Sequence, residues 1–280
     1  RLVRLVLLAT AVCEGLGTVL LFVQWAGRYP APRALALAAF HSVSAFNNAG
    51  FDLFSVSLQP FVEEAGVVLV MAGLIILGGL GFVVLADLWG MRREHWRPTL
   101  HTFMVLRVTA LLIGLGTLFI LVLEWNNPLT LGPLSLKGKI LAAFFHAVTP
   151  RTAGFSVVPV AGFTVPTLVL IIVFMFVGAS PGGTGGGTKT TTFAALLLAV
   201  WATVRGYPEI TVHDRRLPWD VVQRALAITM ISLTLVLVVS MALSLTEGGQ
   251  YLPLLFESTS AFGTVGLSTG VTPDLSPSGR

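Results

Sequence analysis

Three short segments of the chain could surround a dehydrated cation with backbone oxygens. They are Asn48-Ala49-Gly50, Thr152-Ala153-Gly154 and Thr264-Val265-Gly266, and each ends in a glycine. A cation that leaves water needs oxygens in place of its hydration shell, and backbone carbonyls supply them without a full charge. Glycine permits backbone angles that a Cβ atom would penalise. We therefore expect these nine residues to form the ion-binding part of a selectivity filter.

Each segment closes a longer phrase that occurs three times, at residues 40–50, 145–154 and 256–266. In each phrase a phenylalanine comes first, Ser or Thr follows, and glycine ends it. The glycines are 104 and 112 residues apart. Three ordinary turns between helices would not repeat these residue types in a fixed order, so the phrases favour a repeat protein with one pore loop in each unit.

The stretches that lead into the loops must hold them in place. Residues 32–46 and 136–149 are too short to cross a bilayer of roughly 30 Å and too apolar for an exposed loop. We expect them to be re-entrant half-helices, buried in protein within the membrane. Their C-terminal ends carry partial negative charge, which favours a cation near the loops.

Composition places the chain in lipid. Charged residues make up 11% of it and hydrophobic residues 55%, with a mean hydropathy of +0.87. The net charge of +4 comes without a basic stripe interleaved with aromatics, which argues against nucleic acid as a partner. Apolar stretches approach or exceed the roughly 20 residues of a membrane span. They are residues 2–25, 66–88, 105–123, 165–177 continuing after a break through 193–204, and 225–245.

The order of these elements predicts an all-α polytopic membrane protein of repeated helix–pore loop–helix units. A narrow axial pore needs about four loops around one ion, so we expect pseudo-fourfold symmetry and a chain truncated at both ends. The expected units are residues 1–98, 99–207 and 208–280. Arginines cluster between the apolar stretches, as at Arg92-Arg93 and Arg215-Arg216. The positive-inside rule puts them in the cytoplasm and turns all three pore loops outward.

At this point the residues carry a family resemblance. The phrases SAFNNAGF, TPRTAGF and SAFGTVGL, with LGGLGF at 77–82 and FVGASPGGTGGGTKTTTF at 176–193, resemble the KtrB-type membrane subunits of bacterial Ktr potassium uptake systems, in the Trk/Ktr/HKT superfamily. The resemblance covers essentially the whole chain and matches it to the second, third and part of the fourth unit. It implies potassium uptake across the bacterial inner membrane, driven by the ion's gradient and sometimes dependent on sodium. It also implies a homodimer under the control of a KtrA-like cytoplasmic ring of nucleotide-binding subunits. No cofactor is expected in this chain, and the potassium ion is the substrate.

A glycine-rich run interrupts the apolar stretch that begins at residue 165. A phosphate-binding loop is excluded, because Thr188 stands where glycine should precede Lys189 and no strand leads in. Unwound backbone within a membrane must line a water-filled cavity or be buried in protein. The run resembles the intramembrane gating loop of the family, so we expect a gate below the filter, with a structural kink as the alternative. The gate residues are Gly182, Gly183, Thr184, Gly185, Gly186 and Gly187.

Other polar residues receive structural interpretations. Glu14 lies in an apolar stretch, where we expect it to hold a neighbouring pore helix by hydrogen bonds. Arg151 would repel a cation on the axis, so we expect it behind the filter, paired with an acid or a carbonyl. His41 and His146 have no second ligand at metal spacing, so the only metal expected is potassium at the filter. No arrangement of residues supports catalysis, and an enzyme is not expected.

Two classes of transporter fit these patterns. The favoured one is a channel-like potassium transporter, because all three units have the same direct orientation. The alternative is a sodium- or proton-coupled secondary carrier, because broken helices with glycine-rich midpoints also form carrier sites. The family resemblance implies that Gly50, Gly154 and Gly266 favour potassium over sodium, but the missing first filter leaves that choice open.

Overall fold

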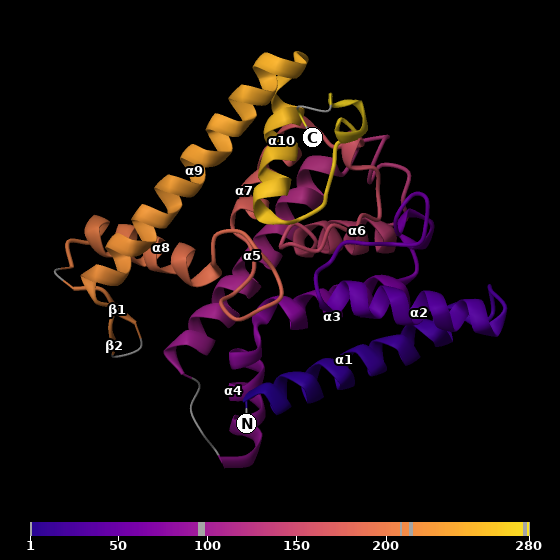
Figure 1. Cartoon of the computed structure of the whole chain (residues 1–280), viewed down its shortest axis with the longest axis horizontal. Helices are drawn as coiled ribbons and strands as arrows, with labels where there is room; N and C mark the ends of the chain where they lie inside the picture. The colour runs from indigo at the N-terminus through magenta and orange to yellow at the C-terminus, as the bar shows by residue number, and fades with distance from the viewer. Residues whose placement is uncertain (1, 95–98, 208, 213–214, 277–278, 280) are drawn as a thin grey trace.

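The computed structural model describes residues 2–94, 99–207, 209–212, 215–276 and 279. Helices dominate these residues (Figure 1), as the sequence predicted. They are α1 (Leu2–Trp25), α2 (Ala31–Phe46), α3 (Ala65–Leu80), α4 (Phe82–Glu94), α5 (Leu100–Glu124), α6 (Leu136–Val148), α7 (Val165–Phe176), α8 (Thr190–Val204), α9 (Trp219–Glu247) and α10 (Tyr251–Gly263). Single 3₁₀ turns occur at Gln59–Phe61, Val160–Gly162 and Thr272–Asp274.

A two-residue antiparallel ladder joins α8 to α9. It consists of β1 (Thr211–Val212) and β2 (Arg215–Arg216), with Thr211 opposite Arg216. Nearby, Ala199, Ala202 and Val222 form a small apolar cluster of their own. Figure 1 shows this end of α8 and α9 extending away from α2 and α6.

A long helix, a short helix and a glycine loop follow one another three times along the chain. The short helices are α2, α6 and α10, and the first two lie where half-helices were predicted, at residues 32–46 and 136–149. Ser135 caps the start of α6, because its Oγ accepts a hydrogen bond from the backbone N of Gly138 at 3.1 Å. Thr264 ends α10 with a left-handed φ of 53°. Local capping chemistry thus sets the bounds of these short helices.

The long helices α1, α5 and α9 are long and apolar enough to cross a membrane. Only 11% of the most apolar window is buried in α1, and the same share in α9. Such exposed apolar faces suit contact with lipid, which is as apolar as the side chains themselves. The bounds of α1 match the predicted stretch 2–25, and α5 and α9 contain the stretches predicted at 105–123 and 225–245.

The apolar stretch at residues 66–88 was predicted as one membrane-spanning segment, but it is not a continuous helix. The helix breaks between α3 and α4, which are bent by 98°. Gly81, at the break, has a φ of 92°, which a side chain would disfavour. The backbone N of Phe82 donates to Gly182 O at 3.1 Å, in the glycine-rich run. The break therefore provides a docking point for a segment a hundred residues away.

The main core lies where the short helices meet the long ones. Trp25, Phe46, Phe145, Phe155 and Phe256 are fully buried there. Helix α1 packs on α2 and α3, α5 packs on α6, and α10 contacts both α7 and α9. These contacts hold the three glycine loops at the centre of the molecule.

Candidate selectivity filter and gate

The glycines of the three loops lie around one point. A Cβ atom added to Gly50 would lie 3.0 Å from Ala153 O and 3.5 Å from Val265 O. One added to Gly154 would overlap Val265 O and lie 3.4 Å from the Cα of Gly266. Carbonyls and glycines of different loops thus face one another, with little or no room for a side chain at Gly50 and Gly154. This arrangement could present backbone oxygens to a cation.

The backbone of each loop alternates in the same way. Gly50, Gly154 and Gly266 have φ angles of 76°, 76° and 86°. Two residues before each glycine, another residue is left-handed: Asn48 at 51°, Thr152 at 76° and Thr264 at 53°. The residue between them is Ala49, Ala153 or Val265, and none of these three has a positive φ. Reversing the sign of φ at successive residues rotates the peptide planes, which allows neighbouring carbonyls to face one side.

The residue types of these loops predicted the site but not the left-handed conformation of Asn48, Thr152 and Thr264. Asn48 offered a signal, because asparagine is enriched at positive φ. Thr152 and Thr264 offered none, because a β-branched residue at positive φ is an outlier. Surrounding structure has to impose such a conformation.

Hydroxyl groups of the short helices brace two loops from behind. Ser44 Oγ donates to Phe51 O and Thr149 Oγ1 donates to Phe155 O, each at 2.6 Å. Each acceptor belongs to the residue after the filter glycine. Both donors are the fourth residue after the phenylalanine that opens the phrase, so this part of the repeat has a defined structural role.

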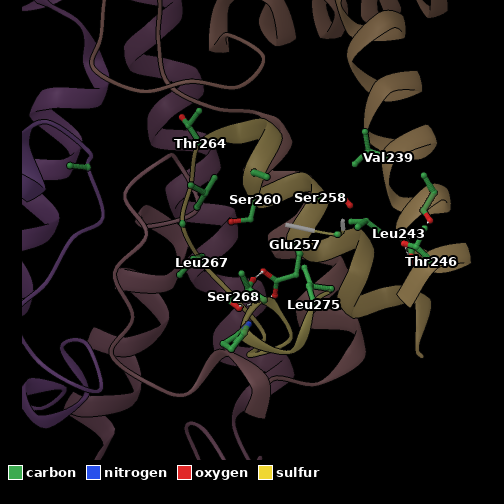
Figure 2. A pocket seen from close by; sticks show the side chains of 18 residues that line it. Val239, Leu243, Thr246, Glu257, Ser258, Ser260, Thr264, Leu267, Ser268 and Leu275 are labelled. Carbon is green, nitrogen blue, oxygen red and sulfur yellow. Dashed lines mark hydrogen bonds between the residues drawn. The ribbon is translucent and has the colours of Figure 1, made fainter. Parts of the chain in front are cut away.

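Glu257 holds the segment that follows the loop at Gly266. Its Oε1 accepts from Ser268 Oγ and from the backbone N and Oγ1 of Thr269, at 2.8–2.9 Å, and its Oε2 accepts from Thr272 Oγ1 at 2.6 Å. Figure 2 shows the Glu257 carboxylate pointing at Ser268. A cavity of about 1000 Å³ lies beside it, between α9, α10 and this loop. Thr264, Val265 and Gly266 line the cavity, so open space reaches the candidate filter.

His41 does the corresponding work after Gly50. Its Nδ1 lies 2.7 Å from Leu37 O, and its Nε2 accepts from the backbone N of Leu53 at 3.4 Å. Leu53 and Thr269 each follow their glycine by three residues. His146 is fully buried against Phe163, with ring centroids 5.0 Å apart, and neither of its ring nitrogens has a hydrogen-bond partner among the described residues.

The glycine-rich run Gly182–Gly187 lies directly against the three loops. Thr184 Oγ1 accepts from Asn48 Nδ2 at 3.0 Å. A Cβ atom on Gly185 would overlap Thr152 Oγ1, and one on Gly186 would overlap Thr264 Oγ1. Three consecutive residues of the run therefore contact the left-handed residues of the three loops, in chain order.

Backbone hydrogen bonds fix the run to the break in α3 and α4 as well. Ser180 N donates to Gly79 O at 3.0 Å, and Thr184 N donates to Gly78 O at 3.2 Å. At the base of the run, a bridge pairs Val177 with Thr188. The Nζ of Lys189 donates to Gly185 O at 2.8 Å, so this lysine stabilises the run.

Glu14 and Arg151 differ in how well the sequence predicted them. Glu14 Oε1 accepts from Asn47 Nδ2 at 2.6 Å, and its carbonyl accepts from Ser42 Oγ, so its expected role in holding α2 is confirmed. Arg151 is only 3% exposed, but its Nε and Nη2 have no partner among the described residues, so the expected pairing with an acid or carbonyl is not found for these atoms.

Comparison with known proteins settles the family. The model of the family described as TrkH, cation transport protein, matches residues 1–280. The chain belongs to the TrkH family. Like other TrkH-family chains it is a multi-pass membrane protein, which agrees with the expected location in the bacterial cell membrane.

Two relatives of this TrkH-family chain carry the same name, Ktr system potassium uptake protein B. The one from Vibrio alginolyticus is 40% identical over 285 residues, and the one from Bacillus subtilis is 38% identical over 280 residues. Each match covers all of this chain and 62% of the relative. The potassium/sodium uptake protein NtpJ of Enterococcus hirae is 36% identical, with the same coverage. These are names of transport proteins, and the sequence analysis expected a transporter instead of an enzyme.

A solved structure shares the TrkH-family fold. The crystal structure of the potassium transporter TrkH from Vibrio parahaemolyticus matches with a TM-score of 0.68 at 19% identity, over 96% of this chain and 62% of that one. At this identity the match supports the fold and nothing more. The chain thus spans somewhat less than two thirds of the length of the proteins it resembles.

Proposed function

We propose that the complete protein takes up potassium across the bacterial cell membrane by channel-like permeation down the ion's electrochemical gradient. The main support for this proposal is that Gly50, Gly154 and Gly266 lie close together around one point. The backbone oxygens of Ala153 and Val265 face the glycines of other loops there. Fixed carbonyl dipoles can replace the water around a cation and still release it. The names of the relatives support potassium as the cation.

The selectivity filter then consists of Asn48-Ala49-Gly50, Thr152-Ala153-Gly154 and Thr264-Val265-Gly266, with a further loop outside this chain. Residues 1–98, 99–207 and 208–280 are the second unit, the third unit and part of the fourth. The repeated order of a long helix, a short helix and a glycine loop supports these boundaries.

The gate is Gly182–Gly187. Its contacts with Asn48, Thr152 and Thr264 support this role, because a run that touches all three loops can block the path between them. Glycine has more backbone freedom than any other residue, which eases movement of the run. Movement of a short segment between two positions is a recognised form of switching.

The proposed assembly is a homodimer controlled by a KtrA-like ring of nucleotide-binding subunits. The word "system" in the relatives' names supports more than one component. Arg92-Arg93 at the end of α4 and Arg215-Arg216 in β2 are the proposed docking residues, since they lie in the connections between units.

Flux under a fixed membrane potential tests this function. The full-length protein, reconstituted in liposomes, should admit rubidium, a potassium analogue, whenever the rubidium gradient and the potential favour entry. Equal sodium and proton concentrations on both sides should leave that uptake unchanged. Uptake that ceases when the sodium or proton gradient is removed would instead identify a coupled secondary carrier.

A further inference from the structure

We propose that Thr184 is a positioning residue for the filter loop at Gly50, so that the choice between potassium and sodium depends on where the glycine-rich run lies. This rests on the proposed function of the loops as a filter. It goes beyond a gate that only blocks the path, because it makes the filter's own geometry respond to the position of the gate.

Thr184 bonds to three separate parts of the Gly50 unit at once. Its Oγ1 accepts from Asn48 Nδ2 at 3.0 Å and donates to Phe46 O at 3.2 Å. Its backbone N donates to Gly78 O at 3.2 Å. One residue of the run therefore touches the filter loop, the end of the pore helix and α3. It is also the only residue of Gly182–Gly187 that has a side chain.

Asn48 depends on this contact. It is only 6% exposed, and it is left-handed, with a φ of 51°. Its Oδ1 has no hydrogen-bond partner among the described residues, so the bond from Nδ2 to Thr184 is the one that fixes its buried amide group. Without that bond, both polar ends of the amide would be unsatisfied, and the side chain would gain by reorienting. A change at Asn48 alters the peptide planes on either side, whose carbonyls border the ion path.

The other two loops meet the run differently. At Thr152 and Thr264 the contact is with Gly185 and Gly186, which have no side chain to bond with. The Oγ1 of Thr152 has no hydrogen-bond partner among the described residues. Movement of the run would therefore release a side-chain hydrogen bond in the Asn48 loop but only van der Waals contact in the loop at Thr152. This asymmetry makes the Asn48 loop the sensor of the gate's position.

The matched substitutions are Thr184→Val, which keeps the shape and removes the hydroxyl, and Thr184→Ser, which keeps the hydroxyl. Thr190→Val is the control, because Thr190 Oγ1 donates to Ser180 Oγ at 2.9 Å in the same segment without touching the filter. Each variant of the full-length protein is reconstituted in liposomes, and the ratio of potassium to sodium permeability is measured together with total flux.

Thr184→Val should lower the permeability ratio about fivefold, the size expected of one net hydrogen bond, and Thr184→Ser should restore it. Thr190→Val should leave the ratio at the wild-type value. Higher flux with an unchanged permeability ratio in Thr184→Val would show that Thr184 only holds the run in place and does not shape the filter. That result would overturn the inference. A wild-type protein that admits no potassium would instead reject the proposed function itself.

A second variant keeps the inference open to test if Thr184→Val does not fold. Asn48→Gly retains a residue at ease with positive φ and removes the amide. Asn48→Gly alone should also lower the ratio. In protein that carries Asn48→Gly, the residue at position 184 should no longer affect the permeability ratio. Thr184, Thr184→Ser and, where it folds, Thr184→Val should therefore give the same ratio. A further loss on adding Thr184→Val would mean that Thr184 acts by another route, and would count against the proposal.

Discussion

Gly50 and Gly154 are 104 residues apart along the chain, yet they face each other so closely that a Cβ atom on Gly154 would lie 3.2 Å from the Cα of Gly50. Each has a left-handed backbone, and each is braced through the next residue by a hydroxyl of its own pore helix. The repeated phrases at residues 40–50 and 145–154 therefore form two sides of the same candidate filter.

Alanine at the three filter glycines should reduce potassium uptake in a graded order. Gly154→Ala should be the most damaging, because its Cβ atom would overlap Val265 O. Gly50→Ala should follow, and Gly266→Ala should be the mildest, because its nearest neighbour would be 3.7 Å away. Even there the left-handed backbone costs about 1–2 kcal/mol, enough for a loss of roughly tenfold. Rubidium uptake with sodium as competitor measures the effect.

Gly114→Ala is the matched control, because Gly114 lies in α5 with nothing within 4 Å of an added Cβ atom. Its uptake should equal the wild type. If all three filter variants behaved like this control, the loops would have no part in ion selection.

Deletion of residues 183–186 should raise potassium flux and weaken control by the nucleotide-binding ring. The deletion removes the contacts with Asn48, Thr152 and Thr264 that hold the run against the filter. Because Thr184 is lost as well, the permeability ratio of potassium to sodium should fall as in Thr184→Val. Flux per molecule is measured at equal amounts of protein in the membrane. Parental flux with intact nucleotide control would identify the run as a structural kink.

Glu257→Gln should destabilise the outer side of the loop at Gly266. The carboxylate accepts four hydrogen bonds, and an amide group would direct its own donors at some of those partners. The expected loss of stability is about 2 kcal/mol. Thermal unfolding of the detergent-purified full-length protein measures it. Asp274→Asn, at an exposed carboxylate nearby, should leave the transition unchanged, and an equal effect of both variants would argue against a special role for Glu257.

Charge reversal at the inner arginines should abolish co-purification with the nucleotide-binding ring. The change combines Arg92→Glu and Arg93→Glu with Arg215→Glu and Arg216→Glu. If acidic groups of the ring face these arginines, the change turns their attraction into repulsion, which salt confines to short distances. The control is Arg33→Glu, in the first turn of the pore helix α2. Retained nucleotide-dependent flux in the reversed protein would leave attraction to anionic lipid as the role of these arginines.

The sequence by itself determined the membrane class, the long apolar helices α1, α5 and α9, the short helices α2 and α6, and a break in the apolar stretch between residues 177 and 193. These depend on local properties: the length of an apolar stretch, the cap at the start of a helix and the glycines that end it. The sequence also identified Glu14 as a support for α2, because a carboxylate in an apolar helix needs donors and a pore helix supplies them.

Only the tertiary structure decided which distant residues meet. The bend at Gly81 escaped the sequence because the apolar pattern continues through it, whereas the bend depends on a hydrogen bond from Phe82 N to Gly182 O. The left-handed backbone at Thr152 runs against its residue type. The bond between Asn48 and Thr184 joins residues 136 positions apart. Hydropathy and turn chemistry report only on near neighbours in the chain, so contacts of this range become fixed only when the helices have packed.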